Sequence, residues 1–248
     1  MTTLPRLQCR RQFPVAAMVI FYALCTAVLS QDDWTQTFSG EGDETNGLKA
    51  AAEGGDSDAQ YKMAQAAKGR MEYVEALSFY TRAANQGHAA AQFQLGGMYL
   101  MGRGGVDQSD VDAAAWFRKA AMQGDVGAQS ELGNLYETGR GVTKDDDEAA
   151  AWYTRAAEGG DEAAQSALGQ LYKDGRGVEK DEAKTVMWFR KAAESGYPPA
   201  QHAMGVMYAQ GKLVKQSDEM TEEWFGKAAA QGYEPAIKLL QERQEQDI

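Results

Sequence analysis

Four of the chain's five tryptophans recur at a single interval, and this period constrains the fold more than any other feature. They lie 36 residues apart. An Ala-Ala-x-x-Gly element keeps step with them, and its glycines are spaced by 32, 37, 36, 36 and 36 residues. Self-similarity with a period of about 20–50 residues indicates supersecondary units stacked in an array. The tryptophans are Trp116, Trp152, Trp188 and Trp224, and the glycines are Gly55, Gly87, Gly124, Gly160, Gly196 and Gly232.

Each period carries the pattern of two helices. Small or apolar residues at Ala128, Leu132 and Tyr136 follow the i, i+4, i+8 spacing of one helix face. The sequence GRGV then interrupts the pattern, because glycine tolerates the left-handed backbone that ends helices. Three aspartates at 145–147 suit the N-terminus of a second helix, which ends at Gly160. The repeating unit is therefore predicted to be a helical hairpin.

The mixture of small and large side chains explains why the hairpins must stack. Gly and Ala at fixed positions let neighbouring helices approach closely, and we expect the large tryptophan to fill the remaining gap. One helix pair cannot bury its apolar stripe alone, so successive pairs must pack into a solenoid. We predict an all-α fold of about five antiparallel helix pairs over residues 48–248.

The stretch AQSALGQLYKDGRGVEKDEAKTVMWFRKAAESGYPPA resembles a Sel-one-like (Sel1-like) repeat, a branch of the tetratricopeptide-like helical repeats. The resemblance covers residues 48–248, with four regular repeats and a degenerate one at 58–87. It implies a right-handed α-solenoid whose first helices line a concave binding side. The degenerate repeat has Ala64 in place of the glycine and a shortened loop, so we interpret it as an N-terminal cap. The final segment, PAIKLLQERQEQDI, turns polar and is interpreted as a C-terminal cap.

The first 30 residues have the pattern of a secretory signal peptide. Three arginines precede an apolar run of 17 residues at 13–29, and small residues occupy Val28 and Ser30. We expect cleavage before Gln31 and export to the periplasm or the medium. The alternative is an uncleaved membrane anchor, although a full span needs about 20 residues.

Residues 31–47 carry five acidic side chains and no basic one. This composition predicts a flexible acidic tether, in which Trp34 is either a stray residue or a short docking element. Both cysteines, Cys9 and Cys25, precede the tether. The exported part is therefore expected to have no disulfide and no cysteine metal ligand.

The strongly acidic charge narrows the classes of partner. The whole chain has a formal charge of −11, and removal of residues 1–30 leaves 22 basic against 36 acidic side chains, or −14. A body of this charge repels polyanions, so we expect neither nucleic acid nor anionic lipid as a ligand. The only membrane contact expected is the possible anchor at 13–29.

Motifs with catalytic or metal-binding chemistry are weak in this sequence. GRG is not a phosphate loop, because no strand precedes it and no Gly-Lys-Ser/Thr follows. The acidic run at 144–148 lacks the spacing, glycine and distal glutamate of a calcium loop. The two histidines, His88 and His202, have no local partners of a nucleophile set. We expect no metal, cofactor or catalytic residue. The alternative is a β-lactam-binding or -hydrolysing enzyme, as linked to cysteine-rich members of the wider family, although their paired cysteines and a Ser-x-x-Lys motif are absent.

The resemblance places a binding face on the first helix of each pair. Three positions per helix, at i, i+4 and i+7, share one face and vary between repeats, although a plain solvated surface would vary similarly. We predict an exported adaptor or scaffold that binds a protein or peptide there, or a membrane-anchored scaffold if the signal is retained. The candidate contact residues are Tyr61, Gln65, Phe93, Leu100, Met101, Asn134, Gln170 and His202.

Large apolar side chains among these candidates concentrate in the first two repeats, at Tyr61, Phe93, Leu100 and Met101. Exposed apolar clusters tend to be partner sites, and aromatic residues are favoured in them. We therefore expect a partly apolar, partly basic peptide to bind at this end of the face. The competing explanations are that the tether, residues 31–47, or a second copy of the chain covers it.

Overall fold

The computed structural model describes residues 46–246. The predicted signal peptide or anchor, the first 15 residues of the tether with Trp34, and both cysteines therefore lie outside the described residues. A compact unit begins at Ala52 and contains every helix named below. All regular secondary structure in residues 46–246 is helical, which confirms the predicted all-α class.

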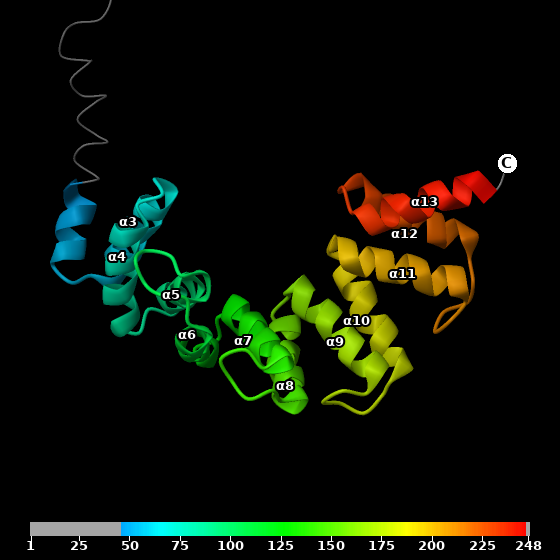
Figure 1. Ribbon diagram of the computed structural model, residues 1–248, viewed down its shortest axis with the longest axis horizontal. Helices are drawn as coiled ribbons and strands as arrows, with labels where there is room; N and C mark the ends of the chain where they lie inside the picture. The colour runs from blue at the N-terminus through cyan, green and yellow to red at the C-terminus, as the bar shows by residue number, and fades with distance from the viewer. Residues whose placement is uncertain (1–45, 247–248) are drawn as a thin grey trace, which may run out of the picture. The chain divides into compact units, whose positions relative to one another are not determined.

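The helices follow one another as antiparallel pairs, each helix 13 residues long (Figure 1). We call the first helix of each pair helix A and the second helix B. The A helices are α3 (Ser57–Gly69), α5 (Ala89–Met101), α7 (Val126–Thr138), α9 (Glu162–Asp174) and α11 (Pro198–Gln210). The B helices are α4 (Tyr73–Asn85), α6 (Asp110–Met122), α8 (Asp146–Glu158), α10 (Glu182–Glu194) and α12 (Asp218–Ala230), and α13 (Glu234–Gln246) ends the stack.

Local sequence signals define the ends of these helices as predicted. The carboxylate of Asp125 accepts a hydrogen bond from the Ala128 backbone N–H at 2.8 Å and caps α7. Asp145 caps α8 in the same way, which confirms the acidic start of the second helix. At the other end, Gly139 and Gly175 follow α7 and α9 with φ of 73° and 70°. The glycines of the GRG turns thus supply the left-handed residues that stop the A helices.

Helices A and B of one pair approach closely because a glycine faces an aromatic ring. A Cβ added at Gly133 would lie 2.7 Å from the ring of Tyr153, and one at Gly205 would lie 2.5 Å from the ring of Phe225. Gly96 with Phe117 and Gly169 with Phe189 repeat this contact. In the first pair, the corresponding residues are Ala64 and Tyr80, which are both buried. Burial raises the pKa of Tyr80 to about 12.

The tryptophans pack between neighbouring repeats and not beside the helix-A glycine. The ring beside the glycine belongs to the residue after each tryptophan. Trp152 packs instead with the core of the preceding repeat, around Phe117 and Leu132, and Trp188 and Trp224 do the same one and two repeats later. Their exposed fractions are only 6–8%. Each of these tryptophans therefore joins two neighbouring repeats, while the next aromatic residue closes its own pair.

A buried glutamine ties each A helix to the helix before it, which is a B helix for every A helix after α3. The side-chain Nε2 of Gln165 donates to the Ala157 carbonyl at 3.1 Å. The same bond recurs at 3.0–3.2 Å from Gln60, Gln92, Gln129 and Gln201. These bonds satisfy carbonyls that the ends of the B helices leave without a helical partner.

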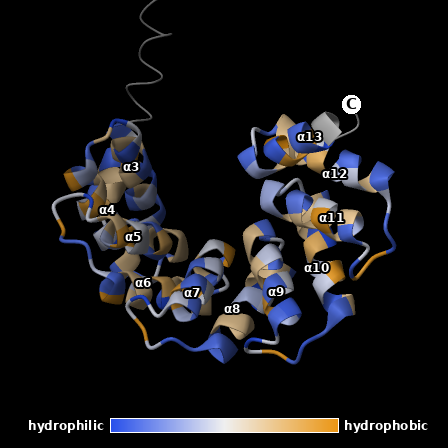
Figure 2. Cartoon of the chain, turned by 45° about the vertical axis from the view of Figure 1, so that its right-hand side comes forward, coloured by the Kyte–Doolittle hydropathy of each residue, from blue (hydrophilic) through white to orange (hydrophobic). Residues whose placement is uncertain are grey.

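Contacts in the stack are local throughout residues 52–246. Each helix packs mainly against the helices before and after it in the chain, with a small additional contact between α7 and α9. Figure 2 shows that individual helices carry both hydrophilic and hydrophobic residues, so no helix forms the core alone. None of the described helices combines the length and hydrophobicity needed to cross a bilayer.

Candidate binding groove

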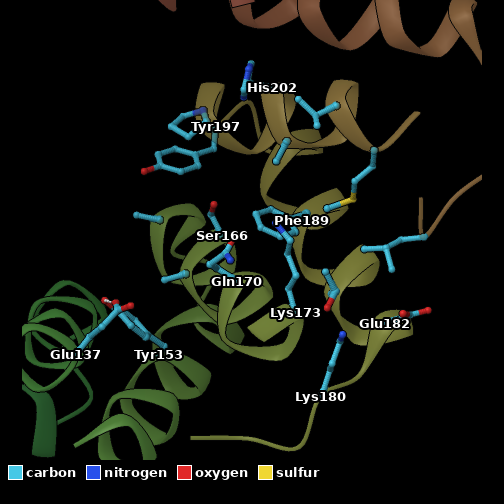
Figure 3. A pocket seen from close by; sticks show the side chains of 18 of the residues that line it. Glu137, Tyr153, Ser166, Gln170, Lys173, Lys180, Glu182, Phe189, Tyr197 and His202 are labelled. Carbon is cyan, nitrogen blue, oxygen red and sulfur yellow. Dashed lines mark hydrogen bonds between the residues drawn. The ribbon is translucent and has the colours of Figure 1, made fainter. Parts of the chain in front are cut away.

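We call the surface made by the exposed side chains of the A helices the A-helix face. A groove of about 1100 Å³ lies on it over α7, α9 and α11, and we call it the C-terminal groove. Side chains of α8 and α10 contribute to its lining, as does the loop that follows α11. Figure 3 shows Tyr197 and His202 on one side of this groove and Lys173, Lys180 and Glu182 on another.

Equivalent positions of the three A helices carry different side chains in this groove. Because successive turns of a helix present i, i+4 and i+7 on one face, each helix contributes three levels. The first level is Ser130, Ser166 and His202, the second is Asn134, Gln170 and Val206, and the third is Glu137, Lys173 and Gln210. The surface therefore changes in size, polarity and charge from one repeat to the next while the helices that carry it do not.

The α7 side of the groove holds two acidic groups, Glu131 and Glu137, and the second already has partners. Glu137 accepts hydrogen bonds from the Tyr153 hydroxyl at 3.0 Å and from Nη2 of Arg176 at 3.0 Å. Burial and the nearby Glu137 raise the pKa of Tyr153, so its phenol stays protonated and donates. Burial, followed by the charge of Asp161, also raises the pKa of Glu131. This side consequently offers less uncompensated negative charge than its carboxylates suggest.

Three lysines line the groove, and we call them the rim lysines. Lys173 lies in the last turn of α9, Lys180 precedes α10, and Lys212 lies in the loop after α11. None of the three forms an ion pair within 4.0 Å with another residue of the region the structure describes. Glu182, which also lines the groove, is absent from those pairs as well.

In two of the repeats, the loop after helix A is fastened to the B helix of the preceding repeat. Arg176 donates to both carboxylate oxygens of Asp146, at 2.9 and 3.3 Å, and a Cβ at Gly177 would overlap the carbonyl of that same residue. Arg140 binds Asp110 similarly, at 2.8 and 3.1 Å. We call this arrangement the loop clamp. Its glycine allows close approach, and its arginine supplies a bidentate ion pair.

The loop clamp is missing from the last repeat. Its sequence is Gly211-Lys212-Leu213, so lysine replaces the arginine and leucine replaces the second glycine. Leu213 has a φ of 69°, in the left-handed region that residues with a Cβ rarely adopt. The equivalent glycines show that a Cβ could not fit against the preceding B helix in the clamped position. Lys212, Leu213 and Glu182 instead line the C-terminal groove, which extends between this loop and α10.

Aromatic side chains border the remaining edge. The imidazole of His202 lies 5.6 Å from the ring of Phe225 and 5.6 Å from that of Tyr233, measured between centroids. Burial lowers the pKa of His202, so the imidazole is neutral near pH 7. Tyr197 and Phe189 also line the groove. These rings give it flat apolar surfaces beside hydrogen-bonding groups, a combination that suits recognition of peptides.

The predicted contact residues fall into three groups in the structure. Asn134, Gln170 and His202 come together along the C-terminal groove. Phe93, Leu100 and Met101 line a second pocket of about 250 Å³, which we call the N-terminal pocket. Tyr61 and Gln65 lie on α3, where the Gln65 amide donates to the Tyr61 hydroxyl at 2.8 Å, and they line neither hollow.

Side chains predicted for the N-terminal end differ in how freely they are exposed. Phe93 is half-buried, with its ring centroid 5.7 Å from that of Phe117. Leu100 is also half-buried against the core, whereas Met101 is 60% exposed. Tyr61 stacks on His88 with centroids 4.7 Å apart. Phe93 and Leu100 thus contribute to packing as well as to the pocket, and Met101 is the most exposed of the four.

The sequence prediction overlooked the groove residues that lie outside the A-helix positions. Lys180, Lys212 and Leu213 come from loops, and Tyr153 and Phe189 come from B helices. One signal in the sequence was available for the loops. The change from GRG to GKL in the last repeat removes both the arginine and the second glycine at once.

Comparison with known proteins gives consistent matches. A family model described as Sel1 repeat matches five consecutive segments, at residues 57–88, 89–125, 126–161, 162–197 and 198–233. No curated protein matches the sequence.

Two solved structures are similar at 34% sequence identity. The first is c5321, a protective antigen of uropathogenic Escherichia coli with an SLR fold, which aligns with a TM-score of 0.73 over 77% of this chain. This chain spans only 42% of the length of that protein. The second is a Sel1 repeat protein from Oxalobacter formigenes, with a TM-score of 0.70 over 80% of this chain and 87% of the other.

Proposed function

Since this chain belongs to the Sel1-repeat family, whose members generally serve as helical scaffolds without catalysis, we propose that it is an exported adaptor that binds a protein or peptide on its A-helix face. The adaptor would present a segment of its partner along α7, α9 and α11.

The observation that carries the proposal is the contrast between constant packing and a variable groove. The glycine–aromatic contacts and buried glutamines recur from repeat to repeat, whereas the groove positions change from serine to histidine and from glutamate to lysine. A regular scaffold with a varied, concave surface is suited to binding one extended partner specifically. The size of the groove, about 1100 Å³, is sufficient for several side chains of a peptide.

Site-specific photo-crosslinking in the native cell tests this function. We would place a photo-reactive phenylalanine analogue at Gln170 in the groove, and at Glu158, which is exposed at the end of a B helix outside the groove, as the matched control. The expected result is one discrete crosslinked protein from the groove position and none from the control. Equal crosslinking at both positions, or none at either, would contradict the proposal.

Export rests on the pattern of residues 1–30 and has its own test. N-terminal sequencing of the protein recovered from the cell envelope or medium should begin at Gln31. An intact N-terminus in the membrane fraction would support the anchored scaffold instead. Turnover of nitrocefin by the purified protein would support the enzymatic alternative.

The N-terminal pocket is a second candidate contact area of the same function. It combines Phe93, Leu100 and Met101 with the cationic side chains Lys68 and Arg103. Once a partner is known, Phe93→Ala with Leu100→Ser should weaken binding at least about tenfold, or 1.4 kcal/mol. Because both residues also pack, Met101→Ser provides the variant with least effect on stability. Unchanged affinity in both proteins would exclude this pocket.

A further inference from the structure

We propose that the C-terminal groove selects an acidic, partly apolar peptide segment. This inference rests on the proposed function and names the chemistry of the partner. An aliphatic or aromatic side chain of the peptide enters the space between α10 and the loop after α11. A neighbouring aspartate or glutamate then pairs with the rim lysines Lys173, Lys180 and Lys212.

The space for the anchor side chain exists because the last loop clamp is missing. In the clamped repeats, arginine and glycine place the loop directly against the preceding B helix. With Lys212 and Leu213 in their places, the groove continues between the loop and α10. The clamped loop after α9 contributes only Lys180 to the lining, whereas the unclamped loop contributes both residues that replace the clamp, Lys212 and Leu213.

The lining at this point is apolar in the floor and cationic at the rim. Phe189, Met207 and Leu213 supply hydrophobic surface, and Thr185 lies beside them. Phe189 and Met207 are themselves buried in the core below, so the floor is already ordered. An apolar side chain entering here would displace water from a preformed surface, which favours binding by about 25 cal/mol per Å² removed from water.

The local charge favours a carboxylate over an ammonium group. The groove is lined by three lysines without ion pairs and by three acidic side chains, Glu131, Glu137 and Glu182. Glu137 is already bonded to Arg176 and Tyr153, so the three lysines outnumber the two acids that have no ion pair. An acidic residue of the peptide would therefore gain partners, whereas a basic one would meet three like charges.

The negative charge of the whole protein does not remove this preference. Charges separated by more than about 8 Å in water are largely screened at physiological ionic strength. The formal charge of −11 is distributed over 248 residues, whereas the lysines line the groove itself. The overall charge should slow the encounter with an acidic peptide, and the lysines should stabilise the complex once formed.

Fluorescence anisotropy with three decapeptides and the full mature protein tests the inference. The peptides share a central Leu-Phe pair and differ only in the two residues on each side, which are acidic, lysine or serine. We expect the acidic peptide to bind at least about tenfold more tightly than the serine peptide, with an affinity that falls as salt rises. Equal binding of all three, tighter binding of the lysine peptide, or no binding of any would overturn the inference. The crosslinking experiment alone would then decide the proposed function.

Two sets of variants separate the groove from general charge effects. Lys173→Glu, Lys180→Glu and Lys212→Glu together should abolish the preference for the acidic peptide and favour the lysine peptide. The matched control makes the same charge change at exposed lysines outside the groove and should retain the original preference. Loss of that preference in the control would overturn the assignment to the groove. The control lysines are Lys62, Lys144 and Lys238.

A further variant closes the space without removing the other two lysines. Lys212→Arg with Leu213→Gly restores the GRG sequence, so the loop should fasten to Glu182 as the other loops fasten to aspartate. We expect at least a tenfold loss of affinity for the acidic peptide in a protein that melts no lower than the parent. Unchanged affinity would overturn the role of the open loop.

Discussion

The loops after α9 and α11 begin from the same repeat pattern and reach opposite outcomes. The first, Gly175-Arg176-Gly177, is clamped to Asp146 by a bidentate ion pair. The second, Gly211-Lys212-Leu213, forms no such pair and lines the C-terminal groove. The two loops thus differ at two positions, and only the first is fastened to the preceding B helix.

The cores beneath the two loops hardly differ. Trp188 and Trp224 are buried to similar extents at successive junctions, and the contacts of Gly169 with Phe189 and of Gly205 with Phe225 are equivalent. The rim of a repeat can therefore change independently of its core. A binding surface can therefore evolve at one junction without altering the stack that supports it.

Removing the core tryptophans should produce the largest effect, and it should be similar at clamped and unclamped junctions. We expect Trp152→Ala and Trp224→Ala each to lower the free energy of unfolding by about 3–5 kcal/mol, the range for emptying a large buried aromatic site. Chemical denaturation would measure both. Trp34→Ala, in the predicted tether, is the control and should have almost no effect. A much smaller loss at Trp224 would show that the core itself differs between the junctions.

Exchanging the clamp glycine with its leucine counterpart should give the next largest effect. Gly177→Leu places a side chain into the carbonyl of Asp146 and forces φ of 63°, so we expect a loss of at least about 2 kcal/mol. Leu213→Gly relieves the strain of a leucine in the left-handed backbone region, but it also removes apolar contact. The net change in the free energy of unfolding should be within about 1 kcal/mol. Thermal melts of the two proteins provide the comparison. Equal losses would contradict the idea that only the first loop is tightly fastened.

Removing the cationic side chain of each loop should give a smaller difference in stability between the two loops. Arg176→Ala should destabilise the protein by about 1 kcal/mol, since the pair is partly exposed, whereas Lys212→Ala should change little. The hydrogen bond from Arg176 lowers the pKa of Asp146 below its ordinary 3.8. The stabilisation is therefore present above that pH and lost as pH falls through the lowered value. Denaturation from pH 7 to pH 2 should show the parent and Arg176→Ala proteins converging, and a constant difference would contradict this origin.

The smallest expected effect is a gain at the fourth repeat. Gln86, Gln123 and Gln231 each donate from the end of a B helix to the buried glutamine of their own repeat, at 2.7–2.9 Å. Ser195 takes this place in the fourth repeat, and Oε1 of Gln165 has no hydrogen-bond partner. Ser195→Gln should add that bond and stabilise the protein by about 0.5–1 kcal/mol.

Gly159 offers a matched control for this gain in the third repeat. A Cβ there would lie 2.7 Å from a methyl group of Val126, so Gly159→Gln should bring no comparable stabilisation. Differential scanning calorimetry would resolve the two. A rise in melting temperature for both, or for neither, would contradict the bond as its cause.

The periodic sequence was sufficient to predict the stack of helix pairs, because the residues that end the helices and the small residues at their contacts recur in each repeat. Ala128, Leu132 and Tyr136 predicted α7, and the glycine of the following turn predicted where it stops. The aromatic residue that packs against the helix-A glycine was harder to predict from the sequence. Trp and the next aromatic residue are adjacent, and only their directions around the helix determine which one packs within the repeat and which packs across the junction.

The predicted contact set captured three residues of the C-terminal groove but not its basic rim. Asn134, Gln170 and His202 lie at regular positions of A helices, where spacing alone defines the shared face. Lys180 and Lys212 lie in loops, whose paths depend on contacts with the preceding repeat. The two pockets also combine residues from several helices, and their volumes follow from side-chain packing that periodicity does not specify.

The local contacts of the stack connect ligand binding with fraying of the chain. Because helices pack mainly against their sequence neighbours, terminal repeats of such a solenoid can open while the middle remains folded. The unclamped loop lies between α11 and α12 and lacks the ion pair that fastens the loops after α7 and α9, so this wall of the groove belongs to a repeat that can open separately from them. A ligand that contacts both α9 and α11 would stabilise that end by mass action and slow amide hydrogen exchange there. Ligand binding would then be detectable as slower exchange in the repeat that contains α11 and α12, without any change in the repeats that precede α7.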